Sequence, residues 1–154
     1  MVKIVHSITI TVFEKNPGDL EKIKPVFKKI LSLDFQKEKI ILSCEKVEGF
    51  NQKEIHIFTL NVTKNNHIKK LLTTVFGRLS DDDKRKLIDQ RESRLDDEGY
   101  FYFRLDKKSL LNDKFMLTEK GDCFHFKIKL ASFPTSRSGF LQSLDMLFSM
   151  FCVQ

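Results

Sequence analysis

Polar side chains of four chemical kinds alternate with apolar ones in two separate stretches of the chain, near 99–105 and 123–133. The polar positions are Tyr100, Tyr102, Arg104, His125, Lys127 and Lys129. Aromatic rings can stack on unpaired bases, and guanidinium or ammonium groups can contact phosphates. We therefore expect this set to bind a nucleic acid. The alternative is an ordinary solvent-facing sheet surface, on which Tyr and Lys pairs across strands are common.

Further cations follow these two stretches. Lys107 and Lys108 come directly after the first and form a basic corner with Arg104. Arg137 follows the second, in a loop that contains Thr135 and Ser136. This loop either binds phosphate through backbone N–H groups and the guanidinium, or simply begins a helix.

Catalytic and metal-binding patterns have little support in this sequence. The four His are dispersed, and no HExxH, GxSxG, P-loop or GxGxxG motif occurs. The three Cys are far apart and form no CxxC pair, which argues against structural zinc and a disulfide framework. We expect no catalytic residue, no metal, no cofactor and no enzymatic activity. The alternative is an RNA-cleaving enzyme whose acidic residues converge on metal ions from several elements.

The surrounding pattern predicts how these side chains are positioned. Strict alternation at 99–105 puts Phe101, Phe103 and Leu105 on the side opposite the tyrosines, as in a half-buried strand. Strands are expected at 4–13, 38–47, 54–62, 99–105 and 123–133, with a turn at 48–52 and a short extended piece at 115–117. Helices are expected at 19–33, 65–79, 80–96 and 139–151, with a helical turn at 109–112.

This order of elements predicts an α+β fold. We expect a two-layer sandwich, in which a mainly antiparallel sheet carries its helices on one face. The polar sides of the strands then form a second, open face. In the first strand the pattern places Ile4, His6, Ile8 and Ile10 together on one side.

Length and charge agree with a domain that binds a polyanion. The 154 residues fit one domain, 1–154. The formal net charge of +6, from 27 Lys+Arg against 21 Asp+Glu, suits a partner such as RNA. A solvated Lys-rich surface, as in proteins of hot habitats, is the alternative explanation.

The C-terminal segment at about 139–151 is unusually apolar for an amphipathic helix. It either packs on the core or forms a dimer interface. If it covered the open face, the predicted binding surface would be lost. It is too short and polar to span a bilayer, which takes about 20 apolar residues. With no signal peptide in the sequence, we expect a cytoplasmic protein without a membrane partner.

The chain resembles small archaeal proteins known as RNA-binding proteins or predicted exosome subunits, from Val5 to about Arg137. The parts that carry the resemblance are Leu79-Ser80-Asp81-Asp82-Asp83, Arg94-Leu95-Asp96-Asp97-Glu98-Gly99, Phe103-Arg104-Leu105-Asp106-Lys107-Lys108, Lys127-Ile128-Lys129-Leu130 and Phe133-Pro134. The resemblance implies a fold similar to that of the large-subunit ribosomal protein that contacts the subunit's small RNA. It also implies an RNA-related role with no assigned enzymatic activity.

Two functional hypotheses follow. The first is a non-catalytic RNA-binding protein, accessory to RNA processing or decay with the exosome, or to ribosome biogenesis, with exosome or ribosome-assembly proteins as partners. The second is a protein-interaction module that forms a homodimer through its C-terminal helix.

Overall fold

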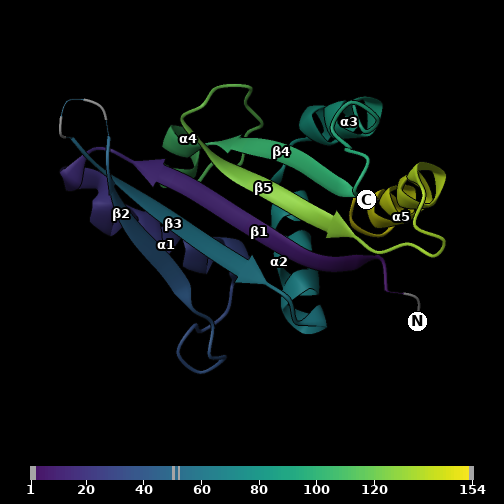
Figure 1. Cartoon of the computed structure of the whole chain (residues 1–154), viewed down its shortest axis with the longest axis horizontal. Helices are drawn as coiled ribbons and strands as arrows, with labels where there is room; N and C mark the ends of the chain where they lie inside the picture. The colour runs from purple at the N-terminus through teal and green to yellow at the C-terminus, as the bar shows by residue number, and fades with distance from the viewer. Residues whose placement is uncertain (1–2, 50, 52, 153–154) are drawn as a thin grey trace.

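A computed structural model describes residues 3–49, 51 and 53–152 (Figure 1). It contains a five-stranded antiparallel sheet with the strand order β2-β3-β1-β5-β4. The strands are β1 (Val5–Glu14), β2 (Leu42–Glu48), β3 (Glu54–Val62), β4 (Tyr100–Asp106) and β5 (Cys123–Leu130). The predicted α+β class with a mainly antiparallel sheet is confirmed. The predicted turn at 48–52 includes Phe50 and Gln52, which lie outside the described residues.

The helices are α1 (Leu20–Leu31), α2 (Asn65–Arg78), α3 (Asp81–Asp89), α4 (Lys107–Leu111) and α5 (Arg137–Phe151), with a 3-10 turn, η1 (Pro17–Asp19), before α1. Of these helices, α1, α2 and α5 pack aromatic side chains against the apolar face of this sheet or against each other. Phe27 of α1 packs edge-on against Phe124 of β5 at 5.4 Å between ring centroids. Phe76 of α2 packs against Phe103 of β4 at 6.2 Å. Figure 1 accordingly shows α1 and α2 behind the sheet, with the other face turned to the viewer.

Two strand patterns differ from expectation in ways that local geometry explains. The register of β1 against β5 shifts between Val5 and Ser7, so a bulge interrupts the alternation there. Val5 is therefore buried, and His6, predicted on the core side, is exposed. β2 begins at Leu42 rather than 38, because a turn closed by a hydrogen bond from the N–H of Ile40 to the carbonyl of Phe35 precedes it.

The helix predicted at 80–96 ends at Asp89. Its start is as expected, since Ser80 caps it by accepting the N–H of Asp83 at 3.1 Å. Beyond Asp89 the chain turns, and Leu95 pairs with Phe101 along the edge of β4. Gly99 ends this turn with a φ of 89°. The ring of Phe140 lies where a side chain at this position would be, so the turn requires glycine.

Pro25 lies inside α1 without ending it. A proline in a helix interior removes one hydrogen bond and costs about 3 kcal/mol. The opposite side of the same helix buries Ile23, Val26, Phe27, Ile30 and Leu31 in the core. Burial of a full apolar stripe offsets the cost, since each such side chain contributes about 1.5–3 kcal/mol.

The apolar helix α5 packs on the core side of the sheet. Phe148 contacts Phe76 of α2 and Phe101 of β4, with ring centroids 6.3 and 5.8 Å apart. Both partners belong to the buried core. The helix begins at Arg137, two residues before the predicted start, because Ser136 caps it by accepting the N–H of Gly139. The alternative in which this segment covers the open face is therefore wrong.

Candidate nucleic-acid interface

The pairing of β4 with β5 brings six of the predicted site residues onto one surface. The registered pairs are Tyr100 with Lys129, Tyr102 with Lys127, and Arg104 with His125. All six side chains are half-buried, while their sequence neighbours Phe101, Phe103, Phe124 and Phe126 are fully buried on the opposite side. We call this polar surface of the sheet the open face.

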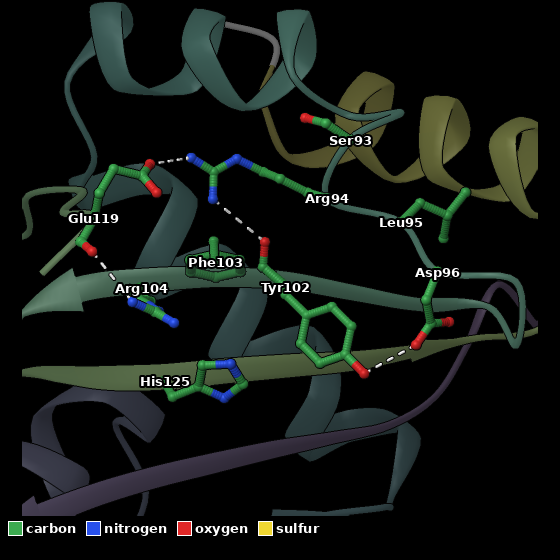
Figure 2. Close-up of a pocket in the computed structure, with 9 residues that line it drawn as sticks. All are labelled: Ser93, Arg94, Leu95, Asp96, Tyr102, Phe103, Arg104, Glu119 and His125. Atoms are coloured by element: carbon green, nitrogen blue, oxygen red, sulfur yellow. Dashed lines mark hydrogen bonds and ion pairs between the residues drawn. The ribbon is translucent and has the colours of Figure 1, made fainter. Parts of the chain in front are cut away.

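A hollow of about 440 Å³ lies where the open face meets the outer edge of β4. The residues that shape it are Arg94, Asp96, Tyr102, Arg104, Glu119 and His125 (Figure 2). Glu119 connects two guanidinium groups. Its carboxylate accepts from Nη2 of Arg94 at 2.8 Å, and its carbonyl accepts from Nη1 of Arg104 at 3.1 Å. Both arginine heads are therefore held at the rim of the hollow, which we call the edge hollow.

A second hollow of about 320 Å³ lies nearer β1, and we call it the Phe13 hollow. Thr11, Phe13 and Cys123 line it together with Arg104 and His125, which also line the edge hollow. Phe13 is 55% exposed, so its aromatic ring is open to contact on this surface. Arg104 and His125 thus separate two concave sites on one sheet surface.

The tyrosines serve the open face differently from what the sequence suggests. The ring of Tyr100 lies beneath the Nζ atoms of Lys127 and Lys129, at 4.2 and 4.5 Å from its centroid. Lys129 also donates to the carbonyl of Glu98. Cation–π contacts of this kind contribute about 0.5–1 kcal/mol at exposed sites. Tyr100 therefore holds two ammonium groups over the sheet, and a base would have to displace them to stack there.

Tyr102 is fixed by Asp96. Its hydroxyl donates to Oδ2 of the carboxylate at 2.9 Å, as Figure 2 shows. Burial and this carboxylate raise the pKa of Tyr102 to about 12. Burial alone would raise the pKa of Asp96, but hydrogen bonds from the N–H of Tyr100, the hydroxyl of Tyr102 and the N–H of Glu98 lower it overall. Asp96 is therefore an anion at neutral pH, and it orients the phenol beside the edge hollow.

His125 is the central side chain of the open face. Its ring lies 5.6 Å from that of Tyr102 between centroids. Burial lowers its pKa, and the positive charges of Arg104 and Lys127 lower it further. The imidazole is consequently neutral at pH 7, so one ring nitrogen donates and the other accepts a hydrogen bond.

Lys107, expected in the basic corner, is buried instead, with 7% of its surface exposed. Its Nζ donates to the carbonyl of Phe13 at 2.8 Å and pairs with Asp122 at 2.7 Å. The carboxylate of Glu14, itself buried, lies 3.5 Å away. These contacts follow from the start of α4 at Lys107, two residues earlier than predicted, which turns the side chain toward β1. We therefore leave Lys107 out of the candidate interface.

The last two predicted residues lie apart from the open face. Lys108 is exposed in the first turn of α4, beyond the end of β4. Arg137 begins α5 and donates to the carbonyls of Leu95 at 3.1 Å and Glu92 at 2.7 Å. Of the two interpretations of the Arg137 loop, the helix start fits these contacts. Its guanidinium fastens the turn after α3 to α5.

Three residues that sequence reasoning missed shape the two hollows: Phe13, Arg94 and Glu119. Phe13 had a readable signal, because strict alternation in β1 places it on the same side as Thr9 and Thr11. Arg94 and Glu119 had none. Their ion pair joins residues 25 positions apart, and only the tertiary fold brings them together.

Within residues 3–49, 51 and 53–152, His, Cys, Asp and Glu side chains form no group of three or more able to hold a metal ion. Over the same residues, every helix is too short or too polar to cross a membrane.

Comparisons with known proteins find similarity to RNA-binding proteins. A family model described as RNA binding matches residues 7–130. The RNA-binding protein PAB1135 of Pyrococcus abyssi is 24% identical over 139 residues, which cover 90% of each chain.

Solved structures share the fold. Protein AF2318 of Archaeoglobus fulgidus superposes with a TM-score of 0.80 at 18% identity, covering 93% of this chain and 99% of the other. Mth689 of Methanothermobacter thermautotrophicus gives a TM-score of 0.75 at 19% identity, covering 94% and 98%. At these identities the likeness concerns the fold alone.

Proposed function

Because the chain belongs to the RNA-binding family whose model matches residues 7–130, we propose that it binds RNA through the open face of its sheet and performs no catalytic step on it. The observation that carries this proposal is the arrangement of Arg104, Lys127 and Lys129. Neighbouring groups hold all three cations on one surface, beside two hollows that share a wall.

Charge held in place is favourable for binding a phosphate backbone. A lysine in solution loses rotamer freedom when it contacts a phosphate, which costs about 1.5–2 kcal/mol. Lys127 and Lys129 already lie against the ring of Tyr100, and Arg104 is already bonded to a carbonyl. Part of the loss of side-chain conformational entropy has therefore already occurred in the free protein. Tyr100, Tyr102 and His125 support the cations and the hollow walls, and Lys108 adds charge at the end of β4.

The biological setting that we propose is accessory. The protein would act in the cytoplasm as one domain, 1–154, in RNA processing or decay with the exosome, or in ribosome biogenesis. The resemblance to predicted exosome subunits and to a ribosomal protein fold supports these settings. Crosslinking to cellular RNA followed by sequencing distinguishes them, because ribosomal RNA precursors and exosome substrates are recovered as different sequences.

Two variants of equal charge test the proposed surface. The first, R104Q/K127Q/K129Q, removes three cations of the open face. The control, K22Q/K46Q/R85Q, removes three exposed cations that pair with acids elsewhere on the surface. At about 1 kcal/mol for each lost contact, the first variant should bind single-stranded RNA about 100-fold more weakly by fluorescence anisotropy. An equal loss in the control would show that net charge, and not this face, binds RNA.

A second candidate function is a homodimer through α5. Met146 and Met150 on the outer side of this helix are 47% and 55% exposed, and Phe133 in the preceding loop is fully exposed. Exposed apolar side chains of this size often lie in interfaces. Light scattering over a range of protein concentrations tests it. A mass that stays at 18.1 kDa would exclude the dimer.

A further inference from the structure

We infer that the two hollows hold two neighbouring unpaired nucleotides, with Arg104 and His125 between them. The edge hollow reads the hydrogen-bonding edge of one base, and the Phe13 hollow stacks the other. This inference rests on the RNA binding proposed above. It adds that the RNA is single-stranded, and that one hollow reads a base while the other stacks one.

The size of the hollows favours unpaired bases. Volumes of about 440 and 320 Å³ lie at the small end of the range for ligand sites, about 300–1,000 Å³. A base enters such a site only when it is splayed out of its stack. In an RNA duplex the bases are paired, and the deep major groove hides their edges. A single strand presents splayed bases at far lower cost.

The edge hollow carries both donors and acceptors. The guanidinium of Arg94 is held by Gln90, at 2.7 and 3.1 Å, and by Glu119, at 2.8 Å. The carboxylates of Asp96 and Glu119 repel phosphate, so the backbone must pass elsewhere. Carboxylates accept hydrogen bonds from exocyclic amino groups, such as N4 of cytosine. Glu119 is well placed for this, because its side chain is 70% exposed and only one of its carboxylate oxygens bonds Arg94.

The Phe13 hollow lacks such acceptors in its wall. Its side chains are the exposed ring of Phe13, the hydroxyl of Thr11 and the thiol of Cys123, beside Arg104 and His125. Stacking on an aromatic ring tolerates every base, because all four have a π-face. This hollow should therefore bind a base without selecting it.

The cations between and beside the hollows fit the backbone that joins the two nucleotides. One nitrogen of the Arg104 guanidinium bonds the carbonyl of Glu119, and donors remain on the other nitrogens for a phosphate. Lys127 and Lys129 follow His125 along β5 on the same face, at the two-residue spacing of a strand. They lie in position to contact phosphates of the neighbouring nucleotides in the RNA.

Fluorescence anisotropy with labelled RNA tests the strand preference. The probes are a ten-nucleotide strand of mixed sequence and the same strand annealed to its complement. The full chain should bind the single strand at least about 10-fold more tightly than the duplex. F13A should weaken single-strand binding about 10-fold. F13L should weaken it by the same amount, because leucine keeps the apolar bulk but has no ring on which a base can stack.

The outcomes separate this inference from the proposed function. If both probes bind equally and R104Q/K127Q/K129Q weakens both, RNA binding stands and the unpaired-strand inference is overturned. If neither probe binds at low salt, both are overturned. If F13L binds as tightly as the unchanged protein, the stacking role of Phe13 is wrong.

A base-selectivity experiment tests the edge hollow. Ten-nucleotide strands of cytidine and of uridine differ on the pairing edge of the base, where cytosine has an amino group and an N3 acceptor and uracil has a carbonyl and an N3–H donor. The unchanged protein should bind the cytidine strand about 10-fold more tightly, and E119Q should lose most of this preference. E48Q, which removes an exposed carboxylate on β2, should keep it. Equal binding of the two strands by the unchanged protein overturns base reading at this hollow.

Discussion

At the scale of single residues, Lys107 shows how burial changes the task of a cation. Its sequence context, next to Arg104 and Lys108, is typical of a basic patch. The fold instead places it at the start of α4, where its side chain lies against Glu14 at the end of β1 and against Asp122. No local pattern predicts this, because its three partners, Phe13, Glu14 and Asp122, are 15 to 94 positions away along the chain. Phe13, by contrast, was predictable from alternation alone.

The burial of Lys107 leads to a stability prediction. K107M removes the ammonium and leaves the carboxylate of Glu14 buried beside an apolar group. Breaking one side of a buried pair costs about 3–5 kcal/mol, so the midpoint of urea denaturation should fall markedly. E14Q/K107M should recover part of the loss. RNA affinity of the folded variant should stay unchanged, and a large drop would return Lys107 to the interface.

At the scale of elements, the strands were easier to predict than the segments that join them. Alternation of period two runs through β4 and β5 without interruption, so their faces could be read directly. The end of α3 could not, because charged residues with good helix propensity continue past Asp89 to Arg94. The chain leaves the helix there to pair with the edge of β4, so contacts between residues distant in sequence determine where α3 ends.

The turn that connects α3 to β4 depends on Asp96. Its carboxylate accepts the N–H groups of Glu98 and Tyr100, each at 2.9 Å, and the hydroxyl of Tyr102. D96N should destabilise the fold by about 1–3 kcal/mol at pH 7, because bonds to a charged acceptor are replaced by weaker ones. The pKa of Asp96 is lowered by folding, so its contribution is present above about pH 4 and is lost as pH falls below that value.

Urea denaturation at several pH values tests this assignment. The stability gap between the unchanged protein and D96N should be largest at neutral pH and should narrow as the pH falls below about 4. Absorbance titration gives a second measure, because the chain has two Tyr. Tyr102 should ionise at about pH 12 in the unchanged protein and at lower pH in D96N. A gap that does not vary with pH would contradict the role of the carboxylate.

The sequence predicts that the C-terminal segment is a helix, but it does not decide whether this helix packs on the core or forms a dimer interface. Phe148 of α5 lies between Phe76 and Phe101 and is 5% exposed. F148A should therefore cost about 3–5 kcal/mol, as expected for an aromatic side chain removed from a core. M150A on the exposed side of the same helix should change stability by less than about 0.5 kcal/mol. Thermal denaturation of both variants measures the contrast, and equal effects would contradict this orientation of α5.

At the scale of the whole molecule, net charge and charge placement make different predictions. The formal charge of +6 says only that a polyanion is attracted. The sheet register adds a location, because it gathers Arg104, Lys127 and Lys129 on one face. The two triple variants proposed above lower the net charge by the same amount, so they separate the effect of charge from that of position.

The salt dependence of binding gives the sharpest test at this scale. For single strands the slope of log affinity against log salt is about −0.7 for each phosphate neutralised, so three cations of the open face give about −2. R104Q/K127Q/K129Q should make the slope shallower by about 2, because the three cations of the open face that displace counterions are gone. K22Q/K46Q/R85Q should keep the slope near −2, since those side chains pair with Asp19, Glu54 and Asp82. A slope much steeper than −2 in the unchanged protein would mean that cations beyond the open face contact the RNA, and the interface would then extend past β4 and β5.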